Sequence, residues 1–146
     1  MTGPEMHIST VAQVIQLSVA PVFLLSGVGI ILTVLTNRLS RVVERARSLE
    51  ESTAGTDHSM REWEIQVLAR RARLMNRAIT LSTVCALLIA LVVVALFVDA
   101  FTTVDLSRSI AMMFVLAMIS LIIGLIMFLR EVFLAIGALR IGIRKK

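Results

Sequence analysis

The sequence predicts an all-α integral membrane protein with three transmembrane helices. Three observations support this fold class: 58% of the 146 residues are hydrophobic, only 17% are charged, and the charges are gathered in blocks between long apolar runs. A soluble domain has slightly under half of its residues apolar and about a quarter charged. A charged side chain has a high free energy in hydrocarbon but not in water. Charges gathered in blocks between apolar runs are therefore the pattern that a bilayer requires.

The first apolar run predicts an N-terminal segment and a transmembrane helix over residues 1–36. Residues 8–36 carry no charged side chain, and about 20 residues suffice to cross a bilayer. Pro21 lies inside this run, so we expect a kink or a break there, with residues 8–20 either crossing the membrane or lying at its surface. A signal peptide carries positive charge ahead of its apolar core, and no Lys or Arg precedes this run, so we expect the helix to be retained.

Two further apolar runs predict transmembrane helices over residues 79–101 and 110–129. Each has about 20 residues without charge, which is the length a membrane crossing needs. A short extracytoplasmic loop, 102–109, joins them. Residues 130–146 are apolar and basic but too short for another crossing, so we expect an amphipathic C-terminal helix at the membrane interface.

The polar insert over residues 37–78 predicts a cytosolic, arginine-rich antiparallel helical hairpin. Its centre, residues 51–59, has the composition of a turn. In both flanking arms apolar residues recur at spacings of three and four, as in an amphipathic helix. We expect each arm to form one continuous helix with the adjacent transmembrane span. We also expect the Trp63 side chain to pack between the two arms.

Basic residues predict the orientation of the chain. Nine arginines lie in the hairpin and five basic residues follow Leu129, whereas Arg108 is the one basic residue in the loop between the second and third spans. Short segments rich in Arg and Lys remain cytoplasmic. We therefore expect the N-terminus outside, and the hairpin and the C-terminus in the cytoplasm.

A row of small and polar side chains follows one side of the first helix. Its members fall within about a third of the helix circumference at 3.6 residues per turn: Ser18, Ser26, Gly29, Thr33, Thr36, Asn37 and Ser40. This polar row has two open interpretations. It is either a helix-packing face, since small residues let membrane helices approach closely, or the lining of a hydrated pathway in an oligomer. Both favour a homo-oligomer.

Arginines at helical spacing predict contact with anionic lipids or with other anions. They are Arg38, Arg41 and Arg45 after the first span, Arg70, Arg73 and Arg77 before the second, and Arg140 and Arg144 in the tail. Anchoring to lipid phosphates is one interpretation, and a basic vestibule that attracts anions is the other. Their position beside the spans argues against a nucleic-acid partner. Asp99 and the Arg130–Glu131 pair lie at span ends, where we expect anchoring rather than proton relay.

The sequence contains no motif typical of an enzyme or of a metal site. It has no HExxH, P-loop, GxGxxG or nucleophile-elbow pattern. His7 and His58 have no ligand spacing to Cys85, which we expect to be a small packing residue. We therefore expect no enzymatic activity, no cofactor and no bound metal.

Three segments carry a resemblance to a known family. They are LTNRLSRVVERARSL (35–49), LARRARLMNRAI (68–79) and FLREVFLAIGALR (128–140). All three resemble the signatures of a bacterial family of small three-helix membrane proteins catalogued as a domain of unknown function. The resemblance covers nearly the whole chain and implies a bacterial cytoplasmic (inner) membrane, but it transfers no activity. The architecture alone is also similar to that of the Oxa1/YidC/Get1 insertases.

Three hypotheses for function follow from these patterns. The first is a homo-oligomeric pore or transport component with the polar row facing its axis. The second is an insertase or a chaperone for membrane proteins. The third is a scaffold or regulatory subunit that binds a cytosolic protein partner through the hairpin.

Overall fold

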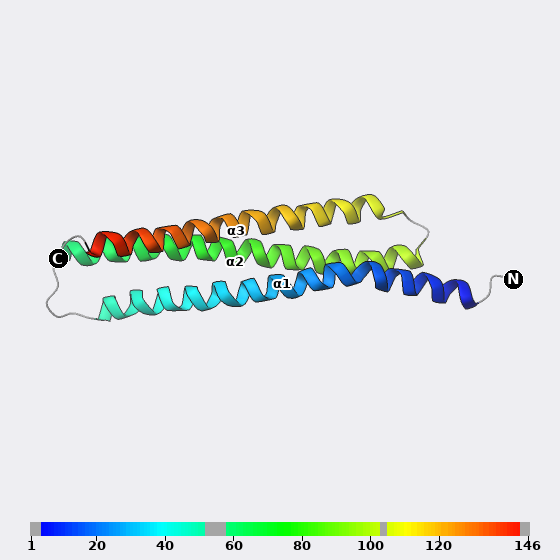
Figure 1. Cartoon of the computed structure of the whole chain (residues 1–146), viewed down its shortest axis with the longest axis horizontal. Helices are drawn as coiled ribbons and strands as arrows, with labels where there is room; N and C mark the ends of the chain where they lie inside the picture. Colours follow the sequence, from blue (N-terminus) through cyan, green and yellow to red (C-terminus); the bar gives the residue numbers. More distant parts are fainter. Residues whose placement is uncertain (1–3, 52–57, 103–104, 144–146) are drawn as a thin grey trace. The chain divides into compact units, whose positions relative to one another are not determined.

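The computed structural model describes residues 4–51, 58–102 and 105–143 of the chain, and side chains within 11–49, 51, 62–102 and 105–135. These residues form three long helices, α1 (Pro4–Glu51), α2 (His58–Phe101) and α3 (Ser107–Ile143), shown in Figure 1. Each helix is long and apolar enough to cross a membrane. The predictions of an all-α chain and of three apolar, membrane-length helices are confirmed.

The helices continue through two positions where the sequence suggested an interruption. Pro21 lies inside α1 and the helix does not break there. A membrane helix tolerates the loss of the backbone hydrogen bond that proline cannot form. Likewise α3 runs through residue 130 to Ile143, so a separate C-terminal helix beginning at residue 130 is not seen. No proline interrupts α3, and the one acidic side chain in its second half, Glu131, is accommodated inside the fold.

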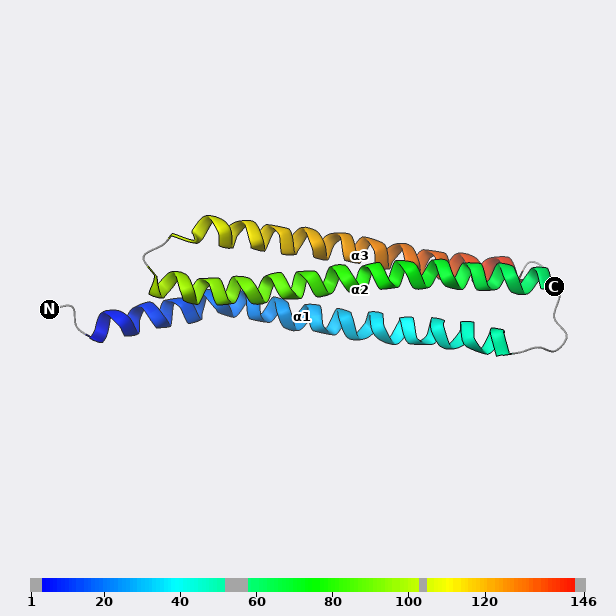
Figure 2. The same ribbon diagram turned by 180° about the vertical axis from the view of Figure 1, so that it is seen from behind.

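The chain divides into two compact units. Unit 1 combines residues 1–31 and 82–121, and unit 2 combines residues 32–81 and 122–146. Each unit therefore contains one segment of every helix. Within a unit the α2 segment runs antiparallel to the α1 and α3 segments, as Figures 1 and 2 show.

In unit 1 each helix buries one face made of small and branched residues. The buried side chains recur at spacings of three, four and seven: Val14, Ser18, Pro21 and Val28 on α1; Ser82, Cys85, Ile89 and Val92 on α2; Ala117, Ser120 and Leu121 on α3. The opposite faces expose large apolar side chains such as Phe23 and Ile30. Exposed apolar surface of this extent is what lipid covers in a membrane-spanning segment. Cys85 is fully buried, as a packing residue is.

In unit 2 the two arms of the predicted hairpin share an apolar core. Val42 of α1 and Leu68 and Met75 of α2 form its centre. The half-buried residues packed against this centre are Leu39, Ala46, Leu49 and Ala72. Trp63 is not among the residues of this core, and its side chain is 51% exposed, so the expected apolar contact between the arms stays a prediction. Residues 52–57 of the predicted turn lie outside the described residues.

The link between α2 and α3 is fixed by two aspartates. The carboxylate of Asp99 accepts the N–H of Leu106 at 2.8 Å. Asp105 accepts both the backbone N–H of Ser107 at 3.0 Å and the Ser107 hydroxyl. These bonds satisfy donors at the N-terminus of α3, which have no partner within the helix. The same two bonds from Ser107 hold the pKa of the exposed Asp105 carboxyl below its ordinary value.

Candidate functional site

The central feature of unit 2 is a carboxylate placed where the helix periodicity calls for an apolar side chain. On α3, Glu131 lies seven residues after the buried Gly124, on the face that packs inward. On α2, Arg71 lies between the buried Leu68 and Met75, three residues after one and four before the other. Residues three, four and seven apart share one face of a helix. The sequence thus directs a negative and a positive group into the same core.

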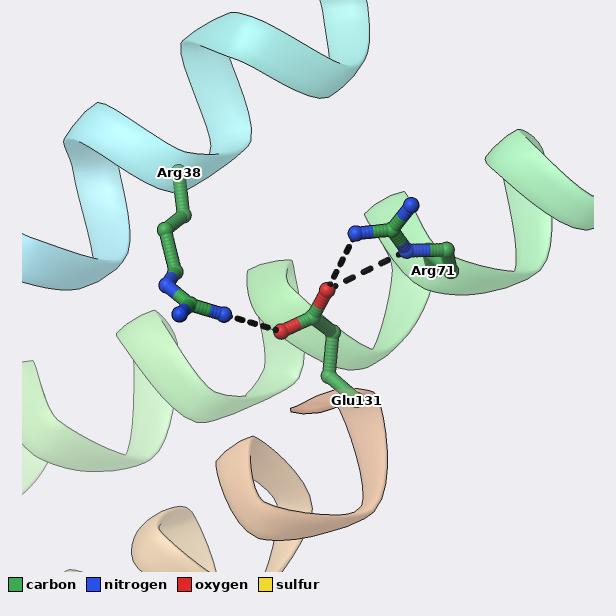
Figure 3. Close-up of polar contacts among 3 residues, drawn as sticks. All are labelled: Arg38, Arg71 and Glu131. Carbon is green, nitrogen blue, oxygen red and sulfur yellow. Dashed lines mark hydrogen bonds and ion pairs between the residues drawn. The ribbon is translucent and has the colours of Figure 1, made fainter. Parts of the chain in front are cut away.

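The geometry satisfies both oxygens of the Glu131 carboxylate, as Figure 3 shows. Oε1 accepts from Nη2 of Arg71 at 2.8 Å and from Nε of the same guanidinium at 3.1 Å. Oε2 accepts from Nη1 of Arg38 at 3.2 Å. Because Arg38 belongs to α1, Arg71 to α2 and Glu131 to α3, this one carboxylate connects all three helix segments of the unit.

The three members of this cluster, which we call the Glu131 cluster, differ in their exposure. The Glu131 side chain is 0% exposed, whereas Arg71 is 21% and Arg38 is 43% exposed. The Arg38 guanidinium also lies over the Phe128 ring, with its central carbon 5.3 Å from the ring centroid, a cation–π contact. A buried carboxylate without partners is too costly to remain ionised. The two guanidiniums therefore offset the cost of burying the Glu131 carboxylate inside the unit.

The predicted arginines fall into two groups. Arg38 is in the Glu131 cluster and Arg45 pairs with Glu64 at 3.2 Å. The remaining predicted arginines that the structure describes are exposed and form no ion pair with another described residue: Arg41, Arg70, Arg73 and Arg77. The side chain of Arg140 and the whole of Arg144 lie outside the described residues.

Two pockets in unit 2 are lined by these arginines. The first has a volume of about 310 Å³, and α1 contributes Arg38, Arg41 and Arg45 to it while α2 contributes Arg71. Because Arg38 and Arg71 already pair with Glu131, and Arg45 with Glu64, much of its charge is neutralised.

The second pocket is larger, about 740 Å³. Its basic side chains come from α2 and α3: Arg70, Arg73, Arg77 and Arg130. None of them pairs with a carboxylate of the described residues. A strong positive field is therefore directed outward at this pocket rather than at the first one.

The polar row on α1 is exposed over most of its length. Ser18 is buried, and the other members are exposed: Ser26, Gly29, Thr33, Thr36, Asn37 and Ser40. Several hydroxyls donate to carbonyls of their own helix, at 3.3 Å from Ser26 to Val22 and at 3.0 Å from Ser40 to Thr36. A Cβ added at Gly29 would meet nothing within 4 Å. The chain itself therefore covers little of this row.

The family model described as a protein of unknown function (DUF2721) matches residues 18–141 of the chain. The chain belongs to this family. The match includes most of both units and all three segments on which the sequence resemblance rests, and it covers the Glu131 cluster and the second pocket. No curated protein and no solved structure matches this DUF2721 chain. The architectural likeness to insertases is not supported by these comparisons.

The sequence analysis did not identify Arg71 as a member of the candidate site, and it did not identify the role of Glu131. The spacing of Arg70, Arg73 and Arg77 drew attention to the exposed face of α2, and Glu131 was paired with its neighbour Arg130. The signal that identifies them is an ionisable residue at an apolar position of the repeat, which requires a buried partner of opposite charge. Among the described residues no cluster of His, Cys, Asp and Glu is arranged to hold a metal ion.

Proposed function

We propose that this protein is a non-enzymatic, homo-oligomeric pore or transport component of a bacterial inner membrane, with the polar row of α1 facing the axis. The hairpin and C-terminus lie in the cytoplasm in this proposal, as the arginine distribution favours. The single observation that carries it is the exposure of the polar row in the isolated chain, from Ser26 to Ser40.

The exposure of these polar groups matters because lipid cannot form the hydrogen bonds that water would form with them. Donation to the carbonyls of the same helix satisfies the hydroxyl protons of Ser26, Thr36 and Ser40, but their oxygens keep accepting capacity. The Asn37 carboxamide is exposed and forms no hydrogen bond with another described residue. Polar groups without partners are unfavourable against lipid. The row is therefore suited to water or to another protein surface.

A second copy of the chain is the simplest such surface. Small residues let two membrane helices approach closely, and hydroxyls hydrogen-bond across the contact. Gly29 has open space around it in the single chain, so its lack of a side chain meets no need within the chain. In a ring of copies the row would face a shared axis, where water solvates the same groups.

The experiment is a pair of matched glycine variants reconstituted in liposomes. Gly27 and Gly29 both lie on α1 with open space at the Cβ position, but two residues on a helix are about 200° apart. We expect the wild type and Gly27→Leu to form oligomers that pass ions, and Gly29→Leu to lose most of the flux. An oligomer that passes no ions at any salt or voltage would contradict the pore and leave the row as a packing face.

A second candidate function rests on Trp63. This side chain is 51% exposed on the α2 arm, and exposed tryptophans are common at protein interfaces. A scaffold that binds a cytosolic partner through the hairpin accounts for it. In that case Trp63→Ala should abolish co-purification of one partner while the oligomer remains intact.

A further inference from the structure

The second pocket of unit 2 has the properties of a ligand site with one charged and one apolar side. We call it the α2–α3 groove. Its four arginines, Arg70, Arg73, Arg77 and Arg130, are all exposed. On α2 they occupy positions three and four apart, which places them along one side of the helix over about 10 Å. Arg130 adds a fourth charge from α3.

The charge of this groove has no counterpart among the residues that the structure describes. Glu131 lies next to Arg130 in the sequence, but its carboxylate is buried and is taken by Arg38 and Arg71. Thus the acidic group closest in sequence does not neutralise the groove. The groove arginines form no ion pair with any residue that the structure describes. Four uncompensated guanidiniums call for a ligand with more than one negative charge.

The apolar side of the groove indicates what kind of anion fits. Phe133 is 65% exposed, and Leu74 and Leu134 are half-buried beside it. A small inorganic anion would leave the Phe133 ring in water. A ligand that carries hydrocarbon as well as charge would cover the ring and gain the free energy of burying it.

The groove also lies where the apolar runs of two helices end. Arg77 directly precedes the charge-free run 78–98, and Arg130 directly follows the charge-free run 109–129. This is the boundary at which phospholipid headgroups meet protein, and basic pockets between helices on the cytoplasmic side bind such headgroups.

We propose that the α2–α3 groove binds an anionic phospholipid whose headgroup carries two phosphates, with hydrocarbon against Phe133 and Leu134. Arginine holds phosphate through paired N–H donors. Three arginines spread over about 10 Å along α2, together with Arg130 of α3, provide two for each phosphate. A lipid with one phosphate would leave half of them without a partner. This binding site is independent of the proposed pore, because it needs only one copy of the chain.

The test compares two double variants of the full chain in neutral detergent. Arg73→Gln with Arg130→Gln changes the groove, whereas Arg47→Gln with Arg108→Gln changes two exposed arginines that line neither pocket. Both lower the net charge of +5 by two. Native mass spectrometry would measure binding of diphosphatidylglycerol, phosphatidylglycerol, phosphatidylcholine and inorganic pyrophosphate to each protein.

We expect the wild type to prefer diphosphatidylglycerol over phosphatidylglycerol by about tenfold or more, and to bind phosphatidylcholine weakly. The groove variant should bind diphosphatidylglycerol about 25-fold more weakly, or roughly fivefold for each arginine, and the control less than about threefold. The single variant Arg70→Gln should show a loss of about fivefold, and it guards against a folding defect in the double variant.

Three results would overturn the proposal. Equal weakening in both double variants would mean general charge attraction. Equal affinity for the lipids with one and two phosphates would remove the basis for two phosphates. Binding of pyrophosphate as tight as that of diphosphatidylglycerol would identify a site for a soluble anion instead of a lipid.

Discussion

Replacing Glu131 with glutamine should weaken unit 2 more than any other single change of a carboxylate in the described chain. The substitution keeps the size of the side chain and removes the negative charge. Arg71, which is 21% exposed, then loses its ion pair and keeps a positive charge in a nearly closed site. Arg38, which is 43% exposed, is less affected because water reaches it.

The magnitude follows from this burial. Removing one partner of a buried ion pair costs about 3–5 kcal/mol. Because both arginines keep some contact with solvent, we expect the lower end, about 3 kcal/mol, for Glu131→Gln. The matched control is Glu64→Gln, also in unit 2. Glu64 pairs with Arg45, and their side chains are 39% and 60% exposed, respectively. Exposed pairs contribute less than about 1 kcal/mol.

The assay is reversible unfolding in mixed micelles with increasing denaturing detergent. Trp63 is the one tryptophan of the sequence and lies in unit 2, so its fluorescence reports on the unit that contains the substitution. Helicity provides a second measure of the same transition.

A third variant separates the charge from the packing. In Arg71→Met with Glu131→Met both charges are gone, and apolar replacement of a buried pair is often neutral or stabilising. We expect this variant to lie within about 1 kcal/mol of the wild type. If Glu131→Gln and Glu64→Gln differ by less than about 1 kcal/mol, the argument from burial is refuted.

Three smaller predictions concern other positions. Met75→Ala removes a side chain that is 1% exposed in the unit 2 core and should cost about 3 kcal/mol in the same unfolding assay, with half-buried Leu74→Ala costing less. The Ser82 hydroxyl is buried and has no hydrogen-bond partner in the described chain, so Ser82→Ala should leave stability unchanged or raise it by about 1 kcal/mol. The Ser107 hydrogen bonds lower the pKa of the Asp105 carboxyl from its ordinary value of 3.8, so this carboxyl should titrate below 3.8 in an NMR experiment. The contribution of Asp105 to stability is present at a pH above its pKa in the unfolded chain and is lost as the pH falls through its pKa in the folded chain. A titration midpoint at or above 3.8 would contradict the lowered pKa.

The helices were predictable because their physics is local. A run of about 20 apolar residues has one stable conformation in hydrocarbon, so the apolar cores of α1, α2 and α3 can be identified from composition alone. The helical course of α1 up to Glu51 and of α2 from His58 follows from the spacing of their apolar residues. Pro21 and residue 130 were less predictable, because whether a helix continues there depends on neighbours that the local sequence does not specify.

The Glu131 cluster depends on partners far apart in the sequence. Arg38 and Glu131 are separated by 93 residues and Arg71 and Glu131 by 60, and no periodicity within one helix pairs them. Local spacing instead paired Glu131 with Arg130, which in the structure lines the α2–α3 groove. The exposed half of the site, by contrast, was visible from the sequence, because Arg70, Arg73 and Arg77 share one side of a single helix.

The dependence of three helices on one carboxylate has a consequence for biosynthesis. Chains emerge from the ribosome N-terminus first, so Arg38 and Arg71 are made before Glu131. Until α3 is made, Arg38 and Arg71 lack the carboxylate with which they pair in the folded unit. The α1 and α2 arms can pack through their shared apolar core before α3 is made, but the ion pairs that connect all three helix segments of unit 2 can form only after it.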